Sequence, residues 1–136
     1  MIDLNIRKKS LNTPLPLVKQ GGAEITTIHV IDPGPGVPSG RIKENELERE
    51  EEAIRPAQEL LNEVDPLAEK EGVNIKKEVV EESDDIGKAI IAYAKKNNFD
   101  VIIVGTTGMT RAEEVFLGSV ANNVIHHAHC PVFAIQ

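Results

Sequence analysis

Residues 101–120 read VIIVGTTGMTRAEEVFLGSV, and this stretch decides the fold that we expect for the chain. The apolar residues 101–104 predict a strand buried on both faces of a parallel sheet, and a helical pattern begins near Val120. Gly105 and Gly108 are separated by two residues, and Gly118-Ser119 follows nine residues later. This order of strand, glycine-rich loop and helix start is typical of the ligand crevice of a parallel α/β sheet.

The glycine loop predicts a site for a phosphate group. Gly105 and Gly108 have no Cβ and can take positive φ, so successive backbone N–H groups can turn inward around an anion. The first turn of the following helix offers further N–H groups, and Ser119 can cap that helix or bond a phosphate oxygen. A tight turn and a helix cap without any ligand are the simpler interpretation. The matched positions in a strand-to-helix context favour phosphate binding.

Short apolar runs alternate with helical patterns along the rest of the chain, which indicates βαβ units. Pro56 and Pro66 should kink or divide the first long helix, and Gly72 should end it. Ser83 is expected to cap the second helix, which ends near Lys96. We expect one α/β domain, residues 1–136, with an open parallel sheet and helices on both faces. Strands are predicted at 24–31, 75–80, 101–104 and 131–135, a loop at 32–40, and helices at 44–71, 85–96 and 120–128.

Charge and composition exclude several classes of function. The 22 acidic and 15 basic residues give a net charge of -7, which argues against a nucleic-acid partner. Aromatic residues make up only 3% of the chain, so no base-stacking platform is expected. The single Cys130 excludes an internal disulfide and fits a reducing compartment. No leader and no apolar run of about 18 residues is found, so we expect a cytoplasmic protein without a membrane span.

The chain resembles the universal stress proteins, whose nucleotide-binding members carry this glycine spacing followed by serine or threonine. Residues 22–32 are similar to the second strand of that family and residues 85–136 to its last third, so the resemblance covers residues 21–136. It implies a Rossmann-like sheet and ATP as the ligand. It also implies a homodimer formed by antiparallel pairing of the last strand, here Pro131 to Ile135, which would hide an apolar edge.

Carried over by position, the resemblance also implies a set of nucleotide contacts. Asp3 lies close to the position of the family's adenine-contacting aspartate, and Val30 would line the adenine or ribose pocket. The remaining contacts run from the end of the third predicted strand to the next helix: Val104, Gly105, Thr106, Thr107, Gly108, Thr110 and Arg111, then Gly118, Ser119 and Val120 at the distal phosphates. Position 107 is Thr where many relatives have His. An exposed loop arginine is an equal interpretation of Arg111.

The N-terminus departs from the family pattern, in which a central strand ends at the adenine-contacting aspartate. Only Met1-Ile2 precede Asp3, so the strand would be almost entirely absent. Alternatively, Ile2, Leu4 and Ile6 form a short alternating strand, or residues 7–9 lead into a strand that has been deleted. A lost central strand would leave unpaired backbone groups on both neighbours, so the N-terminal residues or another chain must fill the gap.

The function that we expect is ATP binding in a regulatory stress-response protein, with slow or no hydrolysis and an unidentified protein partner. No G-x-x-x-x-G-K-[ST] motif is present, so the lysine that acts on the β- and γ-phosphates in P-loop enzymes is missing. Mg²⁺ or Mn²⁺ would be bound mainly by the phosphates and water. We expect no catalytic residues, and the His-rich residues 126–130 predict a solvated helix end rather than a metal site. The alternatives are a non-nucleotide-binding scaffold of the same fold and an enzyme that releases AMP or pyrophosphate, whose Ser-Gly-Gly signature is absent.

Overall fold

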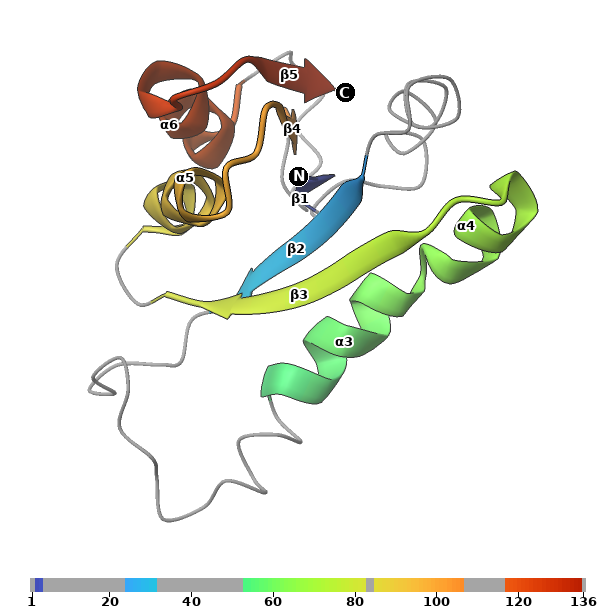
Figure 1. Ribbon diagram of the computed structural model, residues 1–136. Helices are drawn as coiled ribbons and strands as arrows, with labels where there is room; N and C mark the ends of the chain where they lie inside the picture. The colour runs from blue at the N-terminus through green and yellow to red at the C-terminus, as the bar shows by residue number, and fades with distance from the viewer. Residues whose placement is uncertain (1, 4–23, 32–52, 83–84, 107–116, 136) are drawn as a thin grey trace.

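The computed structural model describes residues 2–3, 24–31, 53–82, 85–106 and 117–135. Within them, five parallel strands form one sheet in the order β3-β2-β1-β4-β5. The helices α3 and α4 cover one face of this sheet, and α5 and α6 cover the other (Figure 1). The expected α/β fold with helices on both faces is therefore confirmed. The strands are β1 (Ile2–Asp3), β2 (Ile25–Ile31), β3 (Ile75–Glu81), β4 (Ile102–Gly105) and β5 (Val132–Ile135), and the helices are α3 (Arg55–Asn62), α4 (Asp65–Glu71), α5 (Ile86–Lys96) and α6 (Ser119–His127).

The short strand β1 lies in the centre of the sheet. Ile2 pairs with Thr27 of β2 on one side and with Ile103 of β4 on the other, and Asp3 pairs with Ile28. The N-terminal residues thus fill the gap between β2 and β4, as one of the two expected solutions requires. The interpretations that depend on Leu4, Ile6 and residues 7–9 fall outside the described part of the chain.

Two apolar cores lie on opposite faces of the sheet because side chains alternate along each strand. On the α5/α6 face, Ile28 and Val30 of β2 pack with buried residues of both helices. On the α3/α4 face, Ile25 of β2 packs with Leu61 and Val64. A sheet covered on both sides needs the near-continuous apolar strands that the sequence shows at residues 101–104.

The helical region before β3 is divided close to the predicted break. α3 ends at Asn62 and α4 begins at Asp65, so Pro66 lies in the first turn of α4, where a missing N–H costs nothing. Pro56 likewise lies in the first turn of α3, and the part of the predicted helix before residue 53 is outside the described ranges. Gly72 ends α4 with φ of +66°, as expected for a helix C-terminus.

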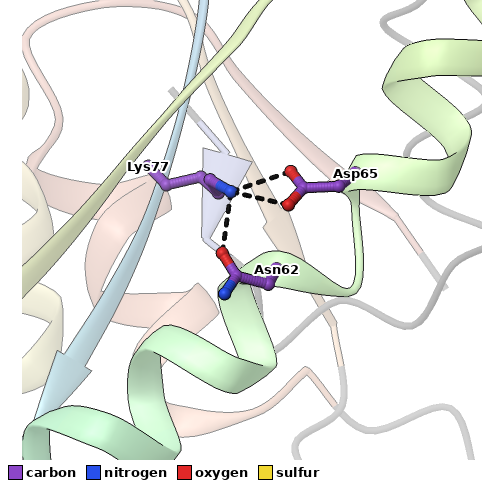
Figure 2. Close-up of polar contacts among 3 residues, drawn as sticks. All are labelled: Asn62, Asp65 and Lys77. Atoms are coloured by element: carbon purple, nitrogen blue, oxygen red, sulfur yellow. Dashed lines mark hydrogen bonds and ion pairs between the residues drawn. The ribbon is translucent and has the colours of Figure 1, made fainter.

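A polar contact from β3 holds the break between α3 and α4. Lys77 Nζ donates to Asn62 Oδ1 at 2.7 Å and lies 2.8 Å from both carboxylate oxygens of Asp65 (Figure 2). The lysine and the aspartate side chains are 29% and 46% exposed, so water screens the ion pair in part. The contact ties the end of one helix and the start of the next to a single strand.

The cap of α5 differs from the expectation. Asp85, rather than Ser83, is the N-cap residue, and its Oδ1 accepts a hydrogen bond from the Lys88 amide at 3.2 Å. Because Asp85 directly precedes the first helical residue, its carboxylate reaches the amide three positions along. Ile90 and Ala94 are fully buried against the sheet, as predicted. No helix in the described ranges is long and apolar enough to cross a membrane.

Candidate functional site

The carboxyl ends of β1 and β4 form the topological switch point of the sheet. From β1 the chain proceeds to β2 on one side, and after β3 it returns to β4 on the other side of β1. Adjacent strands whose connections leave in opposite directions open a crevice at their carboxyl ends. Asp3, the last residue of β1, lies at this point of the sheet.

The end of β4 is extended at Gly105, the first glycine of the predicted nest, while the second, Gly108, lies outside the described residues. Gly105 is the last residue of β4 and pairs with Ile135 of β5. Among the described glycines only Gly72 has positive φ, so the expectation of positive φ at Gly105 is wrong. Parallel pairing explains this, because a ladder residue requires extended backbone. The Thr106 amide continues the ladder by donating to Ile135 O at 2.9 Å.

The start of α6 is brought directly against the end of β4. The Gly118 amide donates to Thr106 O at 2.6 Å. A Cβ at residue 118 would lie 3.1 Å from this same carbonyl oxygen, so the close approach itself favours glycine. Four predicted contacts between these two points are outside the described residues: Thr107, Gly108, Thr110 and Arg111.

Ser119 is not the cap of α6. Gly118 occupies the N-cap position with φ of −58° and ψ of 157°, and Ser119 is the first helical residue. The expected helix 120–128 therefore starts one residue earlier and ends at His127. Ser119 is exposed, and the first amides of α6 have no acceptor within the helix, which leaves them available to an anion.

Val30, Val104 and Val120 all belong to, or pack against, the core on the α5/α6 face of the sheet. Val30 is 6% and Val104 is 1% exposed, and both belong to the core on the α5/α6 face. Val120 is partly buried and packs against the same core. The predicted apolar contacts thus come from three separate elements that share one core, and the two strand residues contribute mainly to packing.

Among the described residues, three buried polar side-chain atoms have no hydrogen-bond partner, two of them on β2 and one just after β4. Thr106 Oγ1 is buried and makes no hydrogen bond, at the point where β4 ends. Thr27 Oγ1 and His29 Nδ1, both on β2, are likewise unpaired. Burial lowers the pKa of His29 below its ordinary value of 6.5, because the charged imidazolium loses its hydration.

The histidines near the end of α6 bond to backbone carbonyls. His126 Nδ1 lies 2.8 Å from Asn122 O, and His127 Nδ1 lies 3.0 Å from Asn123 O. In the part of the chain that the structure describes, no group of three or more His, Cys, Asp or Glu side chains could hold a metal ion.

Sequence reasoning missed one polar pair near the candidate site. Asp85 at the start of α5 and Asn123 in α6 are 38 residues apart in sequence and are in direct contact. The acidic residues before α5 indicate a helix cap, but no periodicity or spacing links them to Asn123.

Comparison with known proteins identifies the chain's relatives. A family model described as the Universal stress protein family matches residues 9–136. The universal stress protein MJ0531 of Methanocaldococcus jannaschii is 37% identical over 139 aligned residues, covering 99% of this chain and 75% of that protein.

Two solved structures with nucleotides in their descriptions share the fold. One is the universal stress protein from Archaeoglobus fulgidus in complex with dAMP, with a TM-score of 0.70 and 21% identity, covering 99% of this chain and 94% of that one. The other is a universal stress protein family protein from Arabidopsis thaliana with AMP bound, with a TM-score of 0.61 and 20% identity, covering 94% and 76%. At these identities the likeness establishes the fold alone.

Proposed function

This chain belongs to the universal stress protein family, and we propose on that premise that it binds an adenine nucleotide at the carboxyl ends of β1 and β4. One observation carries the proposal: a 2.6 Å hydrogen bond from the Gly118 amide to Thr106 O joins the start of α6 to the end of β4, beside the switch point of the sheet. A helix N-terminus at that place favours a phosphate group. The dAMP and AMP complexes of the two structural relatives support adenine as the base.

In the proposed complex the nucleotide lies across the two central strands. The base and ribose contact Asp3, Val30 and Val104, and the phosphates contact the first turn of α6. Gly105 and Thr106 join these two parts, and Gly118, Ser119 and Val120 hold the distal phosphates. The assignments of Thr107, Gly108, Thr110 and Arg111 remain part of the proposal through the resemblance alone.

We propose ATP as the nucleotide, accompanied by Mg²⁺ or Mn²⁺ and hydrolysed slowly or not at all. The absence of a P-loop lysine from the sequence supports slow hydrolysis. The nucleotide state then acts as a signal to a partner protein in a stress response, rather than as a step of an enzyme cycle.

We also propose a cytoplasmic homodimer as the assembled form, and the edge strand β5 supports the dimer. Among the described strands, β5 pairs with β4 alone, and Phe133 at its centre is 52% exposed. An exposed apolar edge favours association, and antiparallel pairing of two β5 strands would cover it symmetrically.

An ATP titration of two matched glycine variants tests the nucleotide site. Gly118→Ala forces a Cβ against Thr106 O and disturbs the first turn of α6, so we expect about a tenfold or greater loss of affinity, equal to about one charge-assisted hydrogen bond. Gly72→Ala introduces Cβ strain at positive φ at the C-terminal end of α4 and should cost about 1 kcal/mol of stability without changing affinity. Isothermal calorimetry and urea unfolding measure the two quantities.

Native mass spectrometry of the purified wild-type protein completes the test. Co-purified ATP, or binding after millimolar ATP is added, is the expected result. A folded wild-type protein that binds no adenine nucleotide would refute the proposal and favour the scaffold alternative.

A further inference from the structure

We propose that the contact between Asp85 and Asn123 positions the start of α6, which makes Asn123 a positioning residue for the nucleotide phosphates. The inference rests on the proposed function for its effect on affinity. That the pair holds the helix start in place rests on the hydrogen bonds between Asp85 and Asn123 themselves.

The pair joins the first residue before α5 to the second turn of α6. Asn123 Nδ2 donates to both carboxylate oxygens of Asp85, at 3.0 Å to Oδ1 and 2.9 Å to Oδ2. Oδ1 also accepts the Lys88 amide at 3.2 Å. These hydrogen bonds, led by the one from the Lys88 backbone, hold the pKa of Asp85 below its usual value, so the carboxylate is ionised at neutral pH.

Gly87 lets the two helices approach closely enough for this contact. A Cβ at residue 87 would lie 2.9 Å from Asn123 Nδ2 and 3.0 Å from Asn123 Cβ. The second distance involves the base of the side chain, so rotation of the asparagine amide alone cannot relieve it. Any larger residue at position 87 must move α6 away from α5 or break the pair.

Asn123 is connected to the phosphate end of the candidate site through one helical turn. It follows Ser119 by four residues, so both side chains lie on the same side of α6. The helix start is fixed at Gly118 by Thr106 O, and Ala121 and Val124 are buried in the core. The polar pair adds a directional contact to this apolar packing, because a hydrogen bond weakens steeply when its angle is distorted.

The test compares Asn123→Ala with Lys77→Met. The control removes a polar contact of similar kind on the opposite face of the sheet, between β3 and the α3/α4 break. We expect Asn123→Ala to weaken ATP binding about five- to tenfold, the lower part of the range for coupling between sites, and Lys77→Met to leave it unchanged. Amide exchange without nucleotide should be faster at Gly118 and Asn122 in Asn123→Ala alone.

An exchange of the two side chains supplies a rescue. Asn123→Asp sets two carboxylates against each other and should weaken binding more than Asn123→Ala, while Asp85→Asn combined with Asn123→Asp restores an amide-to-carboxylate contact. The double variant should recover affinity relative to Asn123→Asp alone. If the pair affected only stability, two variants with the same melting temperature would have the same affinity, and the double variant would not recover affinity over Asn123→Asp.

The outcomes separate this inference from the proposed function. If the wild type binds ATP, and Asn123→Ala shows the same ATP affinity and the same amide exchange as the wild type, the inference is overturned and the proposed function stays intact. No binding by the wild type refutes the proposed function, and exchange at Gly118 and Asn122 then decides whether the pair positions α6. Should Asn123→Ala fail to fold, Gly87→Ala keeps both partners and must show the same losses, or the inference fails.

Discussion

Replacing Thr27 by valine should stabilise the protein, because the buried hydroxyl of Thr27 has no hydrogen-bond partner. Thr27 is 0% exposed and lies in β2 between Ile2 of β1 and Lys77 of β3. It lies two residues after Ile25, on the face of the sheet that α3 and α4 cover. The hydroxyl therefore loses its hydration on folding and gains nothing in return.

The size of the effect of Thr27→Val follows from removing one unpaired hydroxyl while the shape of the side chain is kept. An unpaired buried polar group costs about 1 to 3 kcal/mol, and valine keeps the branched shape and the strand preference of threonine. We expect Thr27→Val to raise the free energy of unfolding by about 1 kcal/mol. For a chain of 136 residues this is about 3 to 5 °C in melting temperature.

Urea unfolding of two variants isolates the contribution of the hydroxyl. Thr27→Ser keeps the unpaired hydroxyl and removes a methyl group, so it should lose about 1 kcal/mol or more. The free energies of unfolding of the two variants should thus differ by about 2 kcal/mol, with Thr27→Val above the wild type and Thr27→Ser below it. Destabilisation by Thr27→Val of about 1 kcal/mol would refute the reasoning, because it would require a hydrogen bond to the hydroxyl.

Three further predictions concern a buried histidine, an ion pair and the sheet edge. Burial lowers the pKa of His29, so the free energy of unfolding should be highest above pH 6.5 and fall below it, because the unfolded chain then takes up a proton that native His29 does not. His29→Leu should reduce this pH dependence of the urea midpoint between about pH 7.5 and 5.5. A double-mutant cycle with Lys77→Met and Asp65→Asn should give a coupling of about 0.5 to 1 kcal/mol, and a value near zero would show that water screens the pair fully. Phe133→Glu should convert the proposed dimer to a monomer in light scattering, and an unchanged mass would exclude β5 as the interface.

The sequence predicts the sheet and its layers well because burial determines the pattern. Residues 101–104 are apolar throughout, as a strand covered on both faces requires, and β4 is buried as expected. Gly72 ends α4 in the left-handed region, and Pro66 begins the helix after the break. These features depend on local backbone chemistry, which a short stretch of sequence fully contains.

The caps and the site geometry are less predictable because they depend on which of several neighbouring polar residues meets the helix. Ser83 and Asp85 can both cap α5, and only the exact helix start selects Asp85. Ser119 suggests a cap for α6, yet the approach of Thr106 O gives that position to Gly118. The Asp85 to Asn123 contact joins distant segments, so no local pattern could predict it.

The position of β1 has a consequence for the order of events in folding. Ile2 pairs with Ile103, about 100 residues later in the chain, so a ribosome working at 5 to 20 residues per second needs about 5 to 20 s to supply that partner. During that time β1, β2 and β3 can pair, while the side of β1 that faces β4 stays unpaired. We expect the β1–β4 ladder, which joins the most distant residues, to close last, and pulse-labelled hydrogen exchange during refolding should protect the amides that join β1 and β4 later than those that join β2 and β3. The N-terminal strand thus acquires its second neighbour only after most of the chain has been synthesised.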